Sequence, residues 1–199
     1  MKQTAIVTGS TRDIGKETAL LLLQKEFNVI ISSWSQQSID NVIQEIHDKF
    51  PSKKENILGI KCDVSQQSEL KSLVDISIKT FGKIDILVNN AGIVYFKSRM
   101  DTTEEEWDNT IDTNLKGIFL FTKEVLPFML ENKSDSIIIN VSSGAGKSGF
   151  PNLSAYCASK FGVIGFTESI ANEVADNNVK VMIICPGGVD TNIDWGYCW

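Results

Sequence analysis

The stretch Thr4-Ala-Ile-Val-Thr-Gly-Ser-Thr-Arg-Asp-Ile-Gly15 joins a run of apolar and β-branched residues to a glycine turn and the start of a helix. Thr4–Thr8 predicts a strand that is buried on both faces, because its residues do not alternate between polar and apolar. Gly9 and Gly15 bracket a turn whose backbone N–H groups can approach a phosphate at the positive end of a helix. Glycine also serves such turns for conformational reasons alone, so the stretch needs support from the rest of the chain.

Five further strand-like runs follow, and helix-length segments separate them. The six predicted strands are Thr4–Thr8, Asn28–Ser33, Ile57–Cys62, Ile84–Asn89, Ser136–Ser142 and Lys180–Cys185. Alternating strands and helices form βαβ units, whose crossovers are almost always right-handed. The chain is therefore predicted to form an α/β fold, a Rossmann-type doubly wound parallel sheet with the strand order 3-2-1-4-5-6. A ligand of such a sheet binds beyond the carboxyl ends of the strands, near the point where the strand order reverses.

Local signals place two of the helices. Between Ile39 and Phe50, apolar residues at three-and-four spacing make one stripe, which predicts a helix that packs one face on the sheet. The capping box Thr103-x-x-Glu106 opens a longer helical stretch, and Pro127 is predicted to kink or end it. No linker, repeat or low-complexity segment interrupts the pattern, so residues 1–199 are predicted to form a single domain.

Composition and charge narrow the class of protein. The 199 residues are 42% hydrophobic and 22% charged, as in soluble globular domains, and the formal net charge is −6. An acidic protein is not attracted to nucleic acid or to an anionic membrane surface. No apolar run reaches the ~20 residues that a membrane-spanning helix needs. We therefore predict neither nucleic-acid nor membrane partners.

Cysteine and histidine usage argues against a metal site. Cys62, Cys157, Cys185 and Cys198 show no paired spacing, and His47, the only histidine, lies beside the apolar stripe of a predicted helix. We interpret the cysteines as reduced thiols and predict a cytoplasmic protein without a metal. The first residues lead directly into a strand and contain no signal-peptide core, which agrees with that location.

Polar and glycine-containing motifs follow the other predicted strands, at the edge where a ligand is expected. Strand three leads to Asp63-Val64, strand four to Asn89-Asn90-Ala91-Gly92, strand five to Ser142-Ser143-Gly144, and strand six to Pro186-Gly187-Gly188-Val189-Asp190-Thr191. Asn114 lies inside the helical stretch between strands four and five. Tyr156 comes thirteen residues after Ser143, and Lys160 follows four residues later.

In their identity and order over nearly the whole chain, these motifs resemble the short-chain dehydrogenase/reductase family. The resemblance implies an oxidoreductase that interconverts a carbonyl and a secondary alcohol with a nicotinamide cofactor. It implies that Tyr156 gives a proton to the carbonyl oxygen, that Ser143 hydrogen-bonds this oxygen, and that Lys160 also holds the nicotinamide ribose. It further implies that Asn114 supports a water relay. The cofactor-binding residues that the resemblance implies are Gly9, Thr11, Arg12, Ile14, Gly15, Ser33, Asp63, Val64, Asn90, Ala91, Gly92, Tyr156, Lys160, Pro186, Gly187, Val189 and Thr191.

The chemistry of the pair Tyr156 and Lys160 agrees with this role. The two residues are one helical turn apart, so their side chains share a face of the helix. A free tyrosine has a pKa of about 10, and a nearby ammonium favours the phenolate, so we predict a lowered pKa for Tyr156. Such a pair is also common on solvated helices, so the pair alone does not indicate a catalytic site, and the other motifs are needed to support one. Ser142 is an alternative to Ser143 as the working hydroxyl, although the spacing to Tyr156 in the family favours Ser143.

The end of strand two bears on the choice of cofactor. A site specific for NAD usually places an acid there to bind the ribose 2′-hydroxyl, but Asn28–Ile39 contains no acid. Ser33 occupies the expected position, and Arg12 stands where family members that prefer NADP carry a basic residue. NADP(H) is therefore favoured. The alternative is that Arg12 and Ser33 are ordinary loop residues and that NAD(H) serves as well.

The chain departs from the family pattern at two places. Asp13 stands where the family has a glycine close to the pyrophosphate, so a carboxylate adds bulk and like charge there. One interpretation is that Asp13 is the N-cap of the first helix, with Arg12 and Lys16 offsetting its charge. The alternative is that the Asp13 carboxylate weakens cofactor binding. The sequence also stops at Trp199, whereas relatives continue through a substrate-covering segment, another helix and a seventh strand. We expect the seventh strand to be missing, and Trp195–Trp199 either covers exposed surface or ends a shortened chain.

Two functional hypotheses remain. The leading one is a reductase or dehydrogenase, for which the resemblance suggests 3-oxoacyl thioesters of acyl-carrier protein or coenzyme A. The residues that could line its apolar substrate pocket, or could be ordinary packing aromatics, are Tyr95, Phe96, Phe150 and Trp195. The alternative is a non-catalytic homologue that acts as a nucleotide-binding or interaction protein. Relatives pair the helices corresponding to Glu104–Leu130 and Ala155–Ala175 across a twofold axis, which predicts a homodimer and leaves a tetramer open.

Overall fold

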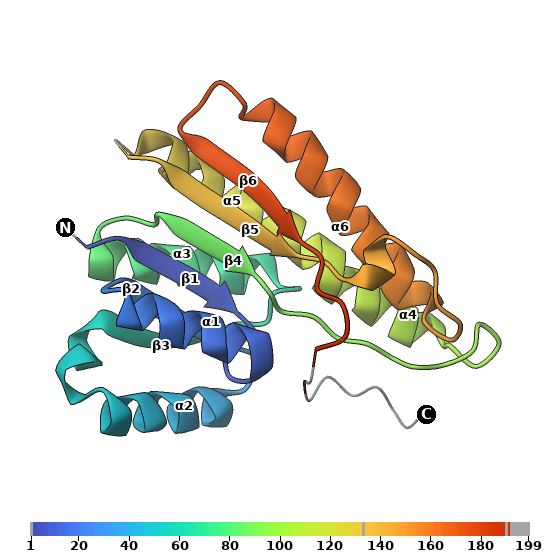
Figure 1. Cartoon of the computed structure of the whole chain (residues 1–199), viewed down its shortest axis with the longest axis horizontal. Helices are drawn as coiled ribbons and strands as arrows, with labels where there is room; N and C mark the ends of the chain where they lie inside the picture. Colours follow the sequence, from blue (N-terminus) through green and yellow to red (C-terminus); the bar gives the residue numbers. More distant parts are fainter. Residues whose placement is uncertain (1, 133, 190, 192–199) are drawn as a thin grey trace.

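The computed structural model describes residues 2–132, 134–189 and 191, which form one parallel sheet with helices on both faces (Figure 1). The strands are β1 (Thr4–Thr8), β2 (Asn28–Ser33), β3 (Ile57–Lys61), β4 (Ile86–Asn89), β5 (Ser136–Val141) and β6 (Val179–Ile184). Their order is β3-β2-β1-β4-β5-β6. The predicted fold class and strand order are thus confirmed, and the predicted strand ends differ from the observed ones by at most two residues.

The helices divide between the two faces of the sheet. Figure 1 shows α1 (Asp13–Gln24) and α2 (Gln36–Lys49) on one face, and α3 (Gln67–Phe81), α5 (Gly117–Glu131) and α6 (Ser154–Glu173) on the other. Neighbouring residues of a strand enter opposite cores: Ile6 packs with α3 and α5, and Val7 packs with α1 and α2. Because both faces of β1 and β2 are covered, their sequences are apolar without alternation.

One long helical stretch connects β4 to β5. The predicted capping box is present: the Glu106 N–H donates to Thr103 Oγ1 at 3.2 Å, and the Thr103 N–H donates to the Glu106 carboxylate at 3.0 Å. The stretch runs through α4 (Glu104–Ile111), a π-helical turn η2 (Asp112–Lys116) and α5. Pro127 does not end it, because α5 continues to Glu131 with Val125 and Met129 fully buried in the core.

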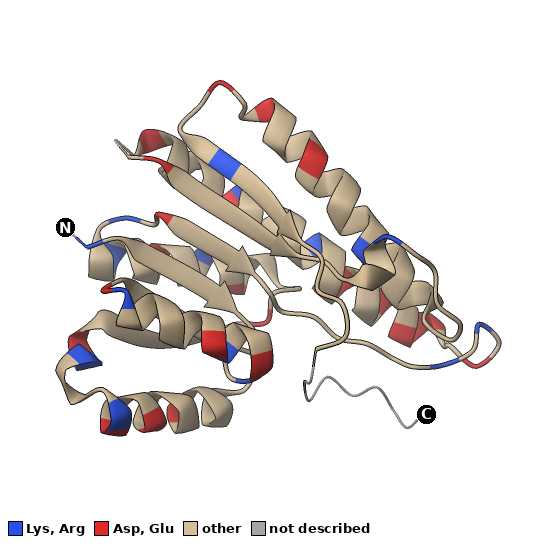
Figure 2. Cartoon of the chain, viewed as in Figure 1, with Lys and Arg blue, Asp and Glu red and all other residues tan. Residues whose placement is uncertain are grey.

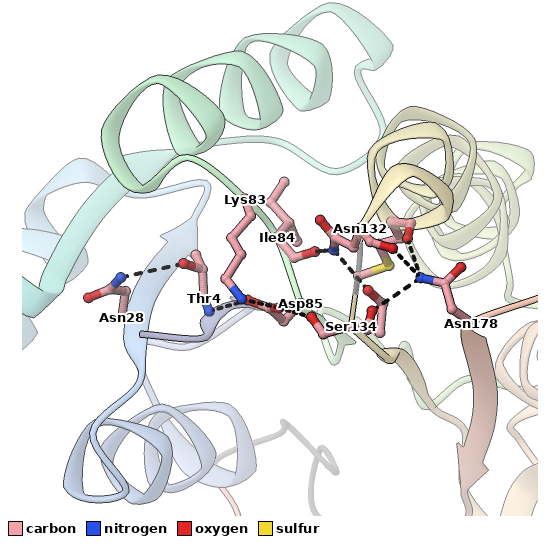
Figure 3. A network of polar contacts seen from close by, with 10 residues as sticks. Thr4, Asn28, Lys83, Ile84, Asp85, Asn132, Ser134 and Asn178 are labelled. Carbon is pink, nitrogen blue, oxygen red and sulfur yellow. Dashed lines mark hydrogen bonds and ion pairs between the residues drawn. The ribbon is translucent and has the colours of Figure 1, made fainter. Parts of the chain in front are cut away.

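The amino ends of the strands are closed by the polar network in Figure 3. The fully buried carboxylate of Asp85 accepts the Thr4 N–H at 2.7 Å and pairs with Lys83 at 2.7 Å. The side-chain amides of Asn132 and Asn178 donate to backbone carbonyls beside them. Buried polar groups at this edge therefore satisfy one another, as folding requires. The opposite edge, at the carboxyl ends of the strands, is hollowed instead.

β6 forms an edge of the sheet, and no strand pairs beyond it among the described residues. Its side chains at Met182 and Ile184 are 51% and 49% exposed, so this edge offers apolar surface. The tail Trp195–Trp199, predicted either to cover exposed surface or to end a shortened chain, lies outside the described residues. None of the described helices combines the length and the apolar character that crossing a membrane requires. Figure 2 shows acidic and basic positions interspersed over the helices and loops.

Candidate active site

A cavity of about 640 Å³ lies at the carboxyl ends of the strands. Its volume is in the range of small-molecule and cofactor sites. The predicted site residues that line it are Gly9, Thr11, Arg12, Ile14, Gly15, Ser33, Asp63, Val64, Asn90, Ala91, Gly92, Ser143, Tyr156, Lys160, Pro186, Gly187, Val189 and Thr191. Asn114 is the one predicted site residue that does not line the cavity. The structure thus brings together side chains that are up to 182 positions apart in sequence, from Gly9 to Thr191.

The turn after β1 is packed too closely for side chains at its glycines. A Cβ at Gly9, which has φ +60°, would lie 2.9 Å from Ala91 Cα, and a Cβ at Gly15 would lie 2.3 Å from the Gly9 carbonyl oxygen. The β4 loop holds the turn, because Thr8 Oγ1 accepts the N–H groups of Asn90 and Ala91, both at 2.9 Å. Gly9 and Gly15 therefore present only backbone to the cavity at the start of α1. This cradle fits the pyrophosphate of a dinucleotide.

Asp13 is the residue of this turn whose negative charge would repel a bound anion. Its interpretation as the N-cap was wrong: Arg12 is the N-cap, with no side-chain capping bond, and Asp13 is the first residue of α1. The φ of Asp13 is +50°, in the left-handed region that a glycine adopts without strain and that Asp tolerates better than most residues. The Asp13 carboxylate lines the cavity, 3.8 Å from Arg12 Nε, while Lys16 pairs with Glu45 at 2.6 Å. Of the two expected partners, Arg12 alone forms an ion pair with Asp13 at short range.

Asn114 lies directly behind the cavity wall, at the centre of the π-helical turn. It is fully buried, its Oδ1 accepts the Ile93 N–H at 2.8 Å, and its Nδ2 donates to the Ile93 carbonyl at 2.9 Å and to Ser159 Oγ at 3.1 Å. A Cβ at Gly92 would lie 3.3 Å from Asn114 Oδ1 and 3.5 Å from Lys160 Nζ. Asn114 therefore ties the β4 loop to α6 next to Lys160. π-helical turns occur often at functional sites, and this one carries Asn114.

Ser143, Tyr156 and Lys160 meet at the end of β5. Tyr156 is 6% exposed and shares a hydrogen bond with the Ser143 side chain. Lys160 is 3% exposed, and its Nζ donates to the Val141 carbonyl at 2.9 Å and lies 5.5 Å from the centre of the Tyr156 ring. The three side chains come from β5 and α6, and they face one cavity.

The electrostatics of this group differ from the expectation. Burial raises the pKa of Tyr156 above its ordinary value, and the hydrogen bond to Ser143 lowers it only in part. The predicted lowering of this pKa was therefore wrong, because desolvation of the phenolate outweighs the stabilising contacts. Burial also lowers the pKa of Lys160 to about 8. At neutral pH the pair consists of a protonated phenol beside an ammonium group close to its own titration point.

Contacts separate the roles of the two neighbouring serines. Ser142 Oγ donates to the Lys160 carbonyl at 2.9 Å, so it fixes the backbone of α6, whereas the Ser143 side chain bonds Tyr156. Deeper in the sheet, the Asn89 amide donates to Asn140 Oδ1 at 2.8 Å, and the Asn140 amide donates to Thr167 Oγ1 at 3.0 Å. These buried bonds join β4, β5 and α6, and they support the helix that carries Tyr156 and Lys160.

Several residues that line the cavity were missed or left open by the sequence. The missed ones are Trp34, Ser38, Cys62, Ile93, Asn109, Thr113 and Val141. Tyr95 was one of four aromatics suggested for the substrate pocket and lines the cavity. Phe96 instead packs against the cluster around Tyr156, and Phe150 is 50% exposed. Burial raises the pKa of the Cys62 thiol to about 12, so this cysteine stays protonated and is no nucleophile. The position of Cys62 directly before Asp63, a predicted site residue, could have identified Cys62 as a lining residue.

The lowered pKa of Lys160 predicts a pH dependence of turnover. Lys160 carries its charge below about pH 8 and loses it as the pH rises through that value. Tyr156, with its raised pKa, keeps its proton over the same range. We expect kcat/KM for carbonyl reduction, measured from pH 6 to 10, to fall with an apparent pKa near 8. A profile that stays flat to pH 10 would contradict a role for the Lys160 ammonium.

The fold and the cavity together define the class of the protein. A doubly wound parallel sheet with a glycine cradle after β1 and a Ser–Tyr–Lys group at its open edge is an α/β architecture in which dinucleotides typically bind. The chain belongs to the short-chain dehydrogenase family, whose sequence profile matches residues 3–197. It is therefore an oxidoreductase that acts on a carbonyl/alcohol pair.

Named relatives agree with this assignment. The chain is 36% identical over 189 residues to a 3-oxoacyl-[acyl-carrier-protein] reductase FabG of Thermotoga maritima, covering 95% of this chain and 75% of that protein. It is 38% identical over 188 residues to FabG of Staphylococcus aureus, covering 94% of this chain and 74% of the relative. The chain thus spans about three quarters of the length of these relatives.

Solved structures share the fold. A variant of actinorhodin polyketide ketoreductase, solved with NADPH, superimposes with a TM-score of 0.89 at 33% identity, covering 96% of this chain and 72% of that one. A short-chain dehydrogenase/reductase from Burkholderia phymatum, solved with NAD, gives a TM-score of 0.91 at 23% identity, covering 96% of this chain and 68% of that one. At that identity the second comparison speaks for the fold alone.

Proposed function

We propose that this protein is an NADP(H)-preferring reductase of 3-oxoacyl thioesters. The observation that carries the proposal is the meeting of Ser143, Tyr156 and Lys160 at one cavity that also contains the glycine cradle. The substrate class is supported by the relatives at 36–38% identity, which are named 3-oxoacyl-[acyl-carrier-protein] reductases. Tyr95 and Ile93 supply apolar surface beside the catalytic group.

Each catalytic residue has a task that follows from its environment. When bound, the reduced nicotinamide supplies hydride to the carbonyl carbon. Tyr156 keeps its proton at neutral pH, because burial raises its pKa, and donates this proton to the carbonyl oxygen. Ser143 orients the phenol and hydrogen-bonds the same oxygen. Lys160 places a buried ammonium beside the phenol and would bind the ribose. Asn114 holds the β4 loop next to Lys160 and would support a water relay there.

The preference for NADP(H) rests on the end of β2. Ser33 and Ser38 line the cavity there, no acid occupies Asn28–Ile39, and Arg12 lines the cavity with its side chain 60% exposed. A 2′-phosphate would meet hydroxyl groups and a guanidinium, whereas no carboxylate of this segment is present to bind a 2′-hydroxyl.

Calorimetric titration with NADPH and NADH tests this preference. We expect NADPH to bind more tightly, and Arg12→Ala to weaken NADPH binding roughly tenfold, as a hydrogen bond to a charged group would. The Kd for NADH is the internal control: it should change less than the Kd for NADPH, because NADH feels only the loss of the Arg12–Asp13 ion pair. Equal Kd values for the two cofactors in the unchanged protein would contradict the preference.

One observation favours the second hypothesis, a non-catalytic homologue. Asp13 lines the cavity beside the glycine cradle, where a pyrophosphate would place its own negative charge. A homologue that acts only as an interaction protein would bind neither cofactor in the titration above. Binding without turnover of a 3-oxoacyl thioester would also favour this hypothesis over an enzyme.

Self-association and location complete the proposal. Phe119 on α5 and Phe161 on α6 are about half exposed, and Phe119 meets Phe166 edge to face with ring centres 6.3 Å apart. Exposed aromatics on these helices suit a symmetric pairing of two copies, and we expect a homodimer at micromolar concentration by sedimentation. A monomer at that concentration would contradict it; a tetramer stays open. A cytoplasmic location agrees with the free cysteines Cys62, Cys157 and Cys185.

A further inference from the structure

Trp34 is a large aromatic side chain left in water at the rim of the cavity. It is 77% exposed, and it lines the cavity next to Ser33. Burial of an exposed indole against a flat apolar partner is favourable, because it removes a large apolar surface from water. The position of Trp34 on the cavity wall suggests that this partner is a ligand of the cavity.

The backbone of Trp34 is held on both sides. The preceding residue, Ser33, ends β2, and its carbonyl accepts the Cys62 N–H at 2.9 Å. The following residue, Ser35, caps α2: its Oγ accepts the Ser38 N–H at 3.3 Å, and its own N–H donates to Ser33 Oγ at 3.4 Å. Trp34 is thus a single residue between two anchored ones. The backbone at Trp34 therefore loses little conformational entropy when the ring binds a ligand.

The cavity has two chemically different ends. Ser143, Tyr156 and Lys160 mark the end where the nicotinamide reacts. In doubly wound sheets the adenosine ribose is bound at the carboxyl end of the second strand, which here is Ser33. The adenine that this ribose carries therefore belongs beside Trp34.

The neighbouring wall combines a hydrogen-bonded carboxylate with apolar surface. The bond between Ser33 and Cys62 places the ends of β2 and β3 side by side, so Trp34 and Asp63-Val64 leave the sheet together. The Asp63 carboxylate is engaged by Ser65, through its N–H at 2.9 Å and its Oγ at 2.8 Å. Val64 contributes an apolar surface to the same cavity. This environment suits a flat, uncharged base.

We propose that Trp34 is the stacking platform for the adenine of the cofactor, an assignment that rests on the proposed nucleotide-dependent function. An indole contacts the face of the base and senses nothing of the ribose 2′ substituent. Trp34 therefore sets affinity for adenine nucleotides as a class, while Ser33 and Arg12 set the choice between NADPH and NADH. Loss of a base–aromatic stack weakens binding about 5- to 150-fold.

Binding measurements on Trp34 variants separate these contributions. Dissociation constants are measured for NADPH, NADH, adenosine 2′,5′-bisphosphate and nicotinamide mononucleotide. We expect Trp34→Ala to weaken binding of the first three by a common factor in that range, and to leave nicotinamide mononucleotide unchanged. Trp34→Phe should recover most of the affinity, because it keeps an aromatic face. Trp107→Phe, at a 41% exposed tryptophan on α4 that does not line the cavity, is the matched control.

Fluorescence gives a second readout that needs no turnover. Adenosine 2′,5′-bisphosphate should quench tryptophan emission of the unchanged protein and of Trp107→Phe, but not that of Trp34→Phe. Unchanged affinities in Trp34→Ala, or a loss confined to NADPH, would overturn the stacking assignment while leaving the proposed function intact. Failure of the unchanged protein to bind any adenine nucleotide would overturn both.

Discussion

Tyr156→Phe is expected to lower turnover of a 3-oxoacyl thioester by roughly 10²- to 10⁴-fold, the usual contribution of a general acid. The substitution removes the hydroxyl alone. The ring stays packed with Ala145, Leu153 and Cys157, so the fold and the cavity should persist. Because the phenol is the proton donor and not the main binding contact, the Kd for NADPH should change little.

The measurement is NADPH oxidation with a 3-oxoacyl thioester of coenzyme A, with calorimetry on the same samples. Tyr95→Phe is a matched control, because Tyr95 also lines the cavity and loses the same hydroxyl group. It should keep turnover within a few-fold of the unchanged protein. Comparable rates for Tyr156→Phe and the unchanged protein would remove Tyr156 from the mechanism. A protein that binds NADPH and turns over no thioester or activated ketone would instead be the non-catalytic homologue.

The fold could be predicted because its signals are local and redundant. Runs such as Asn28–Ser33 are apolar without alternation since β2 is covered on both faces, and Ile30 and Ile31 indeed enter opposite cores. The strand order then followed from the handedness of βαβ crossovers, which leaves few topologies. Boundaries were less certain: Ile84 and Asp85 precede β4, although the Asp85 N–H still donates to the Thr4 carbonyl at 2.8 Å.

The candidate site was predicted less completely, because parts of it depend on conformation and burial. The π-helical turn around Asn114 could not be predicted, because its sequence has the same apolar spacing as an ordinary α-helix. The pKa of Tyr156 was predicted to be lowered by the charge of Lys160, but the burial of Tyr156 raises it instead. Trp34 was passed over because an exposed aromatic after a strand has no motif, and only the cavity gives it a role.

Asp13 illustrates the same limit, and it leads to the second large expected effect. Its side chain suggested a helix cap, whereas its backbone occupies a left-handed conformation, with φ +50°. Asp13→Gly should therefore tighten NADPH binding, because it removes a negative charge near the expected pyrophosphate position. Glycine also adopts this left-handed backbone conformation without strain. A repulsion of about 1–3 kcal/mol, reasonable for a like charge at a partly exposed site, corresponds to roughly 5- to 150-fold in Kd.

Two further variants divide this effect between charge and backbone. Asp13→Asn removes the charge and still tolerates a left-handed backbone, so it should tighten NADPH binding nearly as much as Asp13→Gly. Asp13→Ala also removes the charge but resists this conformation, and it should lower the free energy of unfolding by about 1–2 kcal/mol relative to Asp13→Gly. Calorimetry gives the affinities, and urea unfolding gives the stabilities. Salt should narrow the gap between the unchanged protein and Asp13→Asn, because it screens repulsion at an exposed site. Weaker NADPH binding by Asp13→Asn would mean that the carboxylate is a favourable contact of the cofactor, and the repulsion argument would then be wrong.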